Sequence, residues 1–467
     1  MNSPLMIPDS AYYVVCAILV VAVLLGIHLM SRVERAHLGN KISALAVALA
    51  IILTLVKKDI FPVWFLYAAM AAGLITGLVL AAKVKMIAMP QLVALLNGSG
   101  GAASAIVASF SLALLYAGSE HFAKITSSLA IVVGMVTLTG SLVAAGKLHK
   151  IIAQKPVMIP AHRLLLICLS VVLLALISAT GYLPLAVLMA ALIILSSLYG
   201  VLFSVRVGGA DMPITISLLN SLSGVAAAIA GFAVKDILLV SIGGIVGASG
   251  LFLTQIMCRA MNRSLADILL GKTSVQGVKQ DVKEETAHDI VSEEKAAGDP
   301  ADVIREARQV IIVPGYGMAL AQSQHLVREL AGILTRNGAV VRYAIHPVAG
   351  RMPGHMDVLL VEAGVAFNDV FEMETINNDF KTADVTIVVG ANDVLNPAAR
   401  NAQGTPIYGM PILNVDQCRN IVIFNYDLKP GYSGVDNPIY NRKDGVWVIQ
   451  GDAKETVAAM IEALKKS

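Results

Sequence analysis

The stretch VIIVPGYGMAL, residues 310–320, passes from four β-branched residues through a Gly-x-Gly turn into residues that favour a helix. A buried strand, a glycine-rich turn and a helix N-terminus in this order can hold a phosphate, because backbone N–H groups and the helix dipole face the anion. We predict a nucleotide site here, with Gly315 and Gly317 admitting close approach. The alternative is that both glycines serve only tight packing. The helix is predicted to continue to about Asn337 and Gly338.

Short β-branched runs alternate with helical stretches over the whole segment 303–467, which is typical of a parallel α/β sheet. This pattern predicts a Rossmann-like parallel-sheet domain ending in a helix that starts in the 450s. Further strands are predicted at 339–345, 384–389, 407–413, 420–424 and 446–450.

Chemistry-capable residues follow the predicted strands, and ligands of such sheets bind outside the carboxyl ends of the strands. The candidate cofactor-binding residues are Gly315, Tyr316, Gly317, Val348, Ala349, Gly350, Arg351, Met352, Pro353, Gly390, Ala391, Asn392, Asp393, Gly409, Met410, Lys429, Gly431, Tyr432, Ser433, Gly434 and Asp452.

The end of the second predicted strand bears on the choice between NAD and NADP. An NAD site of the usual geometry has an acidic residue there, on the ribose hydroxyls, whereas this strand ends Tyr343-Ala-Ile-His346. Arg351 follows and could pair with a 2′-phosphate through two hydrogen bonds. The pattern therefore favours NADP(H), the alternative being that Arg351 is a surface arginine.

The first half of the chain is nearly uncharged. Of 35 Lys/Arg and 32 Asp/Glu, residues 1–258 carry only 14 and 6, and the mean hydropathy of the whole chain is +0.74. Nine segments are apolar and long enough for membrane helices, although the second is short. They are 11–30, 42–56, 61–82, 90–116, 124–146, 163–181, 183–205, 213–233 and 236–257.

Lys and Arg near the helix ends set the expected orientation. With the N-terminus on the outer side, inner loops hold ten Lys/Arg and outer loops hold four. An odd number of spans puts the two termini on opposite sides. We therefore expect the C-terminal domain to lie in the cytoplasm. The polar segment 259–302 between the two parts is predicted to be a linker.

A repeat occurs within the apolar half. The residues Met89-Pro90 and Asn97 recur as Met212-Pro213 and Asn220 at a constant offset of 123, which indicates a duplicated helix–loop–helix unit. Each asparagine lies about two turns into a membrane helix, where its amide either joins helices or lines a polar path. No carboxylate is expected in the middle of the membrane.

Glycines and cysteines of the apolar half point to packing. Gly243, Gly247 and Gly250 share one helix face and predict close contact with another helix. The four cysteines lack CxxC spacing, so no metal site is predicted. No basic stripe with interleaved aromatics points to nucleic acid.

Several long motifs in one order resemble the proton-translocating nicotinamide nucleotide transhydrogenase family. PGYGMALAQSQH (314–325), RMPGHM (351–356), GANDVLNP (390–397) and GYSGVDNP (431–438) resemble its NADP-binding domain. The repeated MPxxxxLLN and the junction IMCRAMNRS (256–264) resemble its membrane domain. The resemblance covers almost the whole chain and corresponds to the beta subunit.

The resemblance implies an enzyme that couples hydride transfer from NADH to NADP⁺ with proton movement into the cytoplasm. The domain 303–467 would hold NADP(H), in an orientation reversed from other sheets of this class, and 1–258 would translocate protons. A separate alpha subunit would hold NAD(H) in an alpha2-beta2 assembly in the cell inner membrane, surrounded by lipid. Tyr316 would pack on the nucleotide, and 348–353 would follow it, with Arg351 near the 2′-phosphate. Asp393 would couple the redox state of NADP to protonation, and 431–435 would belong to a lid over the bound cofactor.

Two departures from that family are visible. The family commonly has adjacent Lys-Arg before the lid, on the 2′-phosphate, where this chain has Asn425-Tyr426 and retains only Lys429 nearby, so the strictness of NADP over NAD stays open. Some members carry a membrane histidine where this chain has Asn97, so the titrating group would come from the partner. An alternative to the enzyme is a channel or transporter gated by a nucleotide-sensing cytoplasmic domain.

Overall fold

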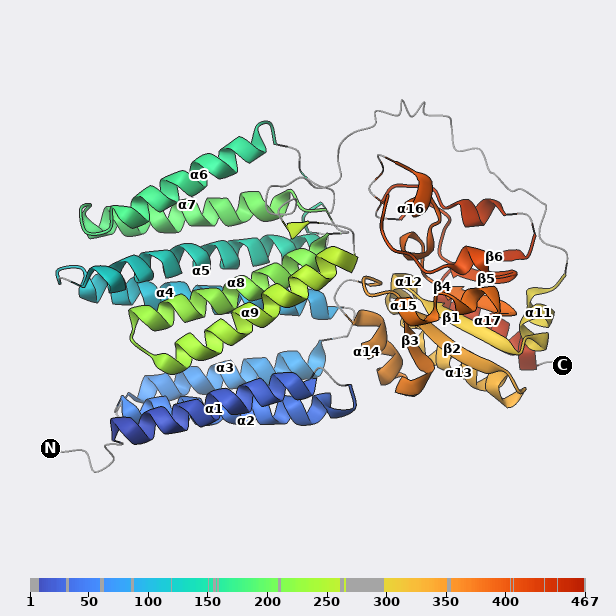
Figure 1. Cartoon of the computed structure of the whole chain (residues 1–467), viewed down its shortest axis with the longest axis horizontal. Helices are drawn as coiled ribbons and strands as arrows, with labels where there is room; N and C mark the ends of the chain where they lie inside the picture. The colour runs from blue at the N-terminus through green and yellow to red at the C-terminus, as the bar shows by residue number, and fades with distance from the viewer. Residues whose placement is uncertain are drawn as a thin grey trace. The chain divides into compact units, whose positions relative to one another are not determined.

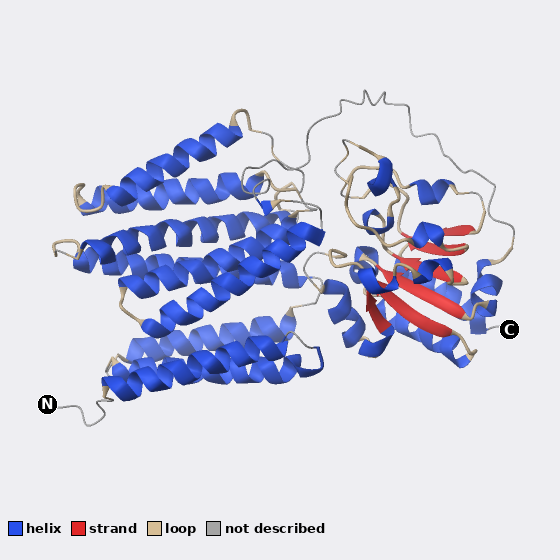
Figure 2. Cartoon of the chain, in the orientation of Figure 1, coloured by secondary structure: helices blue, strands red, loops and turns tan. Residues whose placement is uncertain are grey.

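The described residues form two units. The computed structural model describes residues 8–30, 33–58, 63–84, 88–118, 120–149, 151–153, 157, 159–208, 211–260, 264–265, 298–350, 354–403, 405, 407–431, 433–442 and 444–465. One unit is helical, and the other contains the sheet (Figure 1). In the residues described, every strand lies in the C-terminal part of the chain (Figure 2).

Nine helices make up the described helical part, and each corresponds to one predicted span. They are α1 (Asp9–Met30), α2 (Val33–Lys57), α3 (Trp64–Lys83), α4 (Met89–Leu115), α5 (His121–Leu148), α6 (His162–Ser178), α7 (Leu185–Val205), α8 (Met212–Ala233) and α9 (Ile237–Ala260). Eight of these are long and apolar enough to cross a membrane, and the shorter ninth is α6, with 17 residues. The second helix, predicted to be short, has 25 residues, because its first two turns are polar.

Local sequence explains where these helices begin and end. Both copies of the repeat start a helix at their methionine, Met89 for α4 and Met212 for α8, and a proline fits the first turn because its missing N–H has no helical partner there. Between α6 and α7 the chain reverses at Gly181, whose φ of +102° suits glycine. Among the long helices, α4 packs along α5, α5 along α7, and α1 along α2. Helix α3, by contrast, buries no residue.

The second unit contains a six-stranded, fully parallel sheet in the order β3-β2-β1-β4-β5-β6. The strands are β1 (Gln309–Pro314), β2 (Val340–Ile345), β3 (Val370–Glu372), β4 (Val385–Val389), β5 (Asn420–Asn425) and β6 (Val446–Gln450). The Rossmann-like parallel sheet predicted from the sequence is confirmed.

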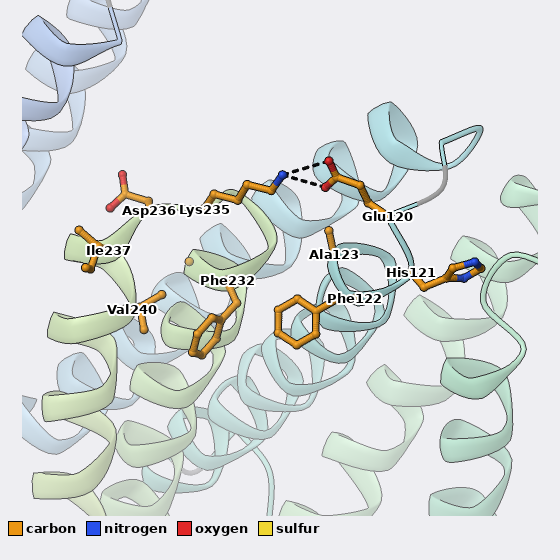
Figure 3. A pocket seen from close by; sticks show the side chains of 10 residues that line it. Glu120, His121, Phe122, Ala123, Phe232, Lys235, Asp236, Ile237 and Val240 are labelled. Carbon is orange, nitrogen blue, oxygen red and sulfur yellow. Dashed lines mark hydrogen bonds and ion pairs between the residues drawn. The ribbon is translucent and has the colours of Figure 1, made fainter. Parts of the chain in front are cut away.

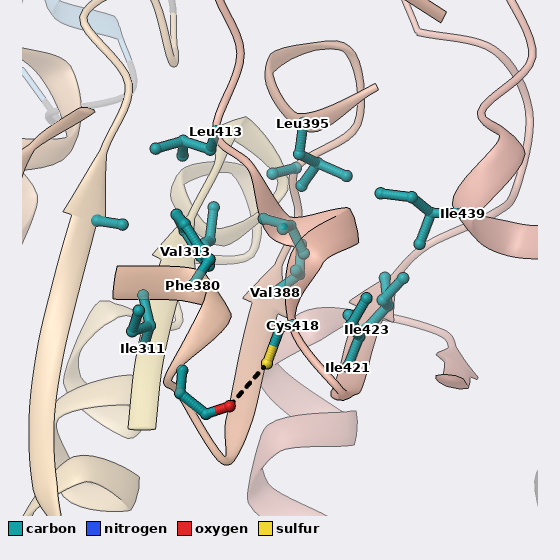
Figure 4. Close-up of a cluster of buried hydrophobic side chains, with 14 of the residues drawn as sticks. Ile311, Val313, Phe380, Val388, Leu395, Leu413, Cys418, Ile421, Ile423 and Ile439 are labelled. Atoms are coloured by element: carbon teal, nitrogen blue, oxygen red, sulfur yellow. Dashed lines mark hydrogen bonds between the residues drawn. The ribbon is translucent and has the colours of Figure 1, made fainter. Parts of the chain in front are cut away.

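Helices and loops cover both faces of this sheet. Helices α13 (Gln324–Arg336) and α17 (Ala453–Lys465) pack on each other and against β2 and β5. The opposite face carries a buried cluster in which alternate strand residues such as Ile311, Val313 and Ile423 meet Phe380 and Ile439 (Figure 4). Alternation puts every second side chain on the same face of a strand.

Three details of the predicted α/β domain are wrong. Residues 407–413 form a loop, because Pro411 has no N–H for a ladder and Gly409 has a φ of +76°; the unpredicted strand is β3, only three residues long. The long helix after β1 is two helices, α12 (Tyr316–Ala321) and α13, separated at Gln322, which has a φ of +52°. The predicted linker lies mostly outside the described residues.

Candidate functional site

A cavity of about 230 Å³ opens beyond the carboxyl ends of β1 and β4. The strand order reverses between these two strands, and doubly wound sheets bind ligands at that point. It is lined by Gly315, Tyr316, Gly317, Val348, Ala349, Gly350, Gly390, Ala391, Asn392, Asp393, Val394, Met410 and Gly431. Twelve of these thirteen are residues that the sequence predicted; Val394 was missed, because an apolar residue after Asp393 carries no signal of its own.

The Gly-x-Gly turn packs directly on the loop after β4. Gly315 N donates to Val389 O at 2.9 Å, and Gly317 N donates to Gly390 O at 2.8 Å. A Cβ at either glycine would lie within 2.6 Å of the Gly390–Ala391 backbone. The two glycines are therefore needed for tight packing against the loop after β4, as the alternative prediction has it. The same packing shapes the wall of the cavity.

Asp393 joins this cavity to the segment after β5. The backbone amide of Ser433 donates to Asp393 Oδ2 at 3.0 Å, and the Ser433 hydroxyl donates to Asp393 Oδ1 at 2.7 Å. Gly431 lies so close that a Cβ there would come within 2.6–2.7 Å of the carboxylate. Among the described residues of the cavity wall, the one acidic side chain is thus held by the predicted lid.

His346, at the end of β2, supports the loop that supplies Val348, Ala349 and Gly350 to the cavity. Its Nε2 lies 2.8 Å from Pro411 O, and its Nδ1 accepts from Val348 N at 3.2 Å. Burial lowers the pKa of His346 to about 4, so the ring is neutral at pH 7 and donates from Nε2. The sequence places His346 at a strand exit but gives no sign of these contacts.

The remaining predicted site residues lie elsewhere or outside the described residues. Asp452 accepts from Lys454 N at 2.8 Å and caps α17, while Lys429 offers its carbonyl to the Asn392 amide at 3.0 Å. Gly409 and Gly434 are also not on the cavity wall. Arg351, Met352, Pro353 and Tyr432 lie outside the described residues.

Asn425 and Tyr426 stand where the family that this chain resembles commonly has Lys-Arg, and the two side chains lie in different surroundings. Asn425 is buried, and its amide bonds inside the domain to Ala391 O at 3.0 Å and to the Tyr440 hydroxyl at 2.8 Å. Tyr426 is 79% exposed. The Asn425 amide donors are therefore engaged within the fold and not directed to a ligand.

In the helical part, the two repeated asparagines differ. Asn97 is buried and donates to Ile216 O on α8 at 3.2 Å, whereas Asn220 is half-buried. The predicted glycine face of α9 is confirmed, because Gly243, Gly247 and Gly250 all contact the backbone of α8. Lys147, one of the ten Lys/Arg that the sequence assigned to inner loops, lies in the last turn of α5 and donates to Val205 O and Val207 O, with 1% exposure.

A larger cavity of about 710 Å³ lies in the helical part, beside the ends of α5, α8 and α9 (Figure 3). Its walls are mostly apolar, with the rings of Phe122 and Phe232 in edge contact. Its one ammonium group, on Lys235, is paired with Glu120 at 3.0 Å. Since a dinucleotide needs backbone N–H groups or free cations for its phosphates, the cavity of the α/β domain is the better candidate for nucleotide.

The comparisons with known proteins agree with these observations. A family model described as NAD(P) transhydrogenase beta subunit matches residues 10–463. Two relatives from Rhodospirillum rubrum, each named NAD(P) transhydrogenase subunit beta, are 42% identical over 468 residues, which cover 97% of this chain and 98% of theirs.

Proposed function

This chain belongs to the NAD(P) transhydrogenase beta-subunit family, a component of an oxidoreductase that uses nicotinamide nucleotides, and we propose that it is the NADP(H)-binding, proton-translocating half of that enzyme. It is a membrane protein, and a subunit named beta has an alpha partner. The proposed domains are 1–258 for translocation, 259–302 as linker and 303–467 for NADP(H).

The observation that carries the proposal is the cavity at the strand-order reversal. Backbone from the Gly315–Gly317 turn, the 348–350 loop and the 390–393 loop converges there. Glycine backbone without side chains lets a dinucleotide approach closely. Arg351 and Lys429 are the proposed cationic partners of the 2′-phosphate. Because the Asn425 amide bonds inside the fold, the site has fewer cationic groups to select NADP(H) over NAD(H) than the family pattern provides.

The nucleotides supply the hydride chemistry, and the protein binds and orients them. In the proposed mechanism the cavity residues, Tyr316 and the lid fix NADP(H), while the alpha subunit presents NAD(H). Asp393 holds Ser433 of the lid when it is ionised, and protonation would remove a charge-assisted acceptor and loosen the lid. Lid opening would thereby be linked to proton uptake.

The membrane half would carry the proton, from the outer side into the cytoplasm. Asn97 and Asn220 are proposed to line the polar path. An asparagine does not titrate, so an ionisable group would come from the alpha subunit. We propose an alpha2-beta2 assembly in the inner membrane, with the N-terminus outside and the C-terminal domain in the cytoplasm. Helix α3, which buries no residue, leaves its surface for lipid or the alpha subunit.

Substitution of Asp393 by Asn tests this proposal. The chain is co-expressed with its alpha partner, and membranes are assayed for NADH-driven reduction of an NADP analogue together with proton uptake. D393N should lose proton-coupled turnover, since the amide cannot ionise. D444N, at an exposed aspartate, is the control. Full coupled turnover in D393N would refute the role of Asp393.

A further inference from the structure

The loop that carries Asp393 leaves the regular sheet before it reaches the cavity. Gly390 has a φ of +70°, and Asn392 has φ −141° and ψ −80°, so neither continues the strand β4. Hydrogen bonds of the strand ladder therefore do not fix the position of Ala391 and Asn392. Side chains from two other segments do so instead.

The first support comes from the end of β5. Asn425 is 6% exposed, and its Nδ2 donates to Ala391 O at 3.0 Å and to the Tyr440 hydroxyl oxygen at 2.8 Å. A side-chain amide has two N–H donors, so both are used. Tyr440 thus fixes the orientation of the amide that holds Ala391.

The second support comes from Asn437, which is 3% exposed. Its Oδ1 accepts from Ile439 N at 3.1 Å and caps the short helix η6 (Pro438–Asn441). Its Nδ2 donates to Asn392 Oδ1 at 3.0 Å. One asparagine therefore connects the start of η6 to a residue on the cavity wall.

Helix η6 is itself anchored in the core. Ile439 is buried in the cluster on the sheet face shown in Figure 4, and Tyr440 packs against the same cluster. Burial also raises the pKa of Tyr440 to about 12, so its hydroxyl keeps its proton at neutral pH. The helix has a fixed place from which both contacts to the loop can act.

We infer that η6 is a positioning element for the nucleotide site: Asn437 and the Tyr440–Asn425 pair set the position of Ala391 and Asn392, and so present Asp393 to Ser433. These are positioning residues and touch no reacting atom. The inference rests on the proposed function, because it assigns the nucleotide to this cavity. It extends the site to the buried asparagines Asn425 and Asn437, which lie 34 and 45 positions beyond the loop residues that they hold.

Tyr440→Phe is the mildest test, because the ring and its packing remain and only the hydroxyl is lost. The chain is assembled with its alpha partner, and NADPH binding is followed by the fluorescence of the reduced nicotinamide. The Kd for NADPH should rise about three- to tenfold, as expected for one neutral hydrogen bond. Tyr426→Phe is the matched control, since Tyr426 is 79% exposed, and its Kd should not change.

Asn437→Asp tests the second contact separately. The carboxylate still accepts from Ile439 N and caps η6, but it cannot donate to Asn392. We expect a rise in the Kd for NADPH and a change in the pH profile of NADPH release, because the position of Asp393 relative to Ser433 changes. A purely structural role would lower the unfolding midpoint and leave the Kd and the pH profile as in the wild type.

The outcomes separate this inference from the proposed function. Wild-type affinity for NADPH in both Y440F and N437D, or an equal loss in Y426F, would overturn the positioning role while leaving NADP(H) binding intact. Failure of the wild-type complex to bind NADPH would overturn the proposed function, and this inference with it. A rise in Kd confined to Y440F and N437D supports it.

Discussion

Ser433 holds the carboxylate of Asp393 at both oxygens, with its amide on Oδ2 at 3.0 Å and its hydroxyl on Oδ1 at 2.7 Å. The two residues are 40 positions apart and come from the segments that follow β5 and β4. Two bonds to one ionised group act together, and both weaken when that group is protonated. In the proposed mechanism this contact would link the position of the lid to the charge of Asp393.

Ser433→Ala should loosen the lid without removing the carboxylate. The variant loses the hydroxyl that donates to Asp393 and accepts from Val435 N at 3.3 Å, and it retains the amide bond to Asp393. Because a hydrogen bond to a charged group contributes roughly 1.5–3 kcal/mol, NADPH should leave about ten- to a hundredfold faster, measured by stopped-flow displacement. Ser433→Thr keeps a hydroxyl and should release NADPH at close to the wild-type rate. An unchanged rate in S433A would show that the contact does not hold the lid.

Gly431→Ala should push the lid away from Asp393. A Cβ at Gly431 would lie 2.6–2.7 Å from the carboxylate atoms, closer than Cβ contacts in proteins, so either residue 431 or the carboxylate must shift. The Kd for NADPH should rise at least tenfold while the chain still folds, since the conflict is at the surface of the cavity.

Gly332→Ala is the control for that substitution. Gly332 lies in α13, where a Cβ would meet only Arg336 Nη1 at 3.7 Å. Alanine should even favour this helix by about 1 kcal/mol. Equal NADPH affinity in G431A and G332A would contradict the closeness of Gly431 to Asp393.

Acid should destabilise the α/β unit through His346. Its folded pKa, about 4, lies below the ordinary 6.5, so the folded state prefers the neutral ring. This stabilisation is complete above pH 6.5 and is lost as the pH falls toward 4, by up to about 3 kcal/mol at 1.36 kcal/mol per pH unit. Hydrogen exchange at Val348 N, which donates to the ring, should accelerate over that interval.

His346→Gln supplies the comparison, because glutamine does not titrate and its amide could still donate to Pro411 O. Exchange at Val348 N should then depend less on pH between 6.5 and 4 than in the wild type, after correction for the intrinsic exchange rate. The same pH dependence in both proteins would mean that another group is responsible.

The sequence was most informative where the signal is local. A β-branched run followed by glycine located the ends of β1 and β4, which supply seven of the twelve predicted residues on the cavity wall. Hydropathy located each of the nine helices described in the apolar half, but it missed the polar first two turns of α2. Both signals come from residues that are neighbours in the chain, so a single sequence contains them.

Long-range contacts account for what was missed. The apolar run 407–413 resembles a strand, yet Asn377 holds it as a loop through Ile412 O at 2.9 Å and Asn414 N at 2.9 Å. Asn425 looked like a lost cationic contact, whereas its amide holds Ala391. Such side-chain amides bond to backbone far along the chain, and no spacing rule reveals them.

Helix α9 contacts α8 through one face that carries Gly243, Gly247 and Gly250, and Gly244 lies off that face, which gives a matched pair of substitutions. A Cβ at Gly243 would lie 2.5 Å from Ala228 N on α8, whereas a Cβ at Gly244 would meet nothing within 4 Å. Overpacking of this kind costs roughly 1–3 kcal/mol, so G243A should melt a few degrees below the wild type in detergent and lose coupled turnover. G244A should match the wild type in both measurements, because its new methyl group meets no atom. The pair is matched, since both variants gain the same group in the same helix. Equal melting temperatures of the two variants would contradict the close approach of α8 and α9 at Gly243. A lower melting temperature in G243A alone would show that the glycine face stabilises the membrane half.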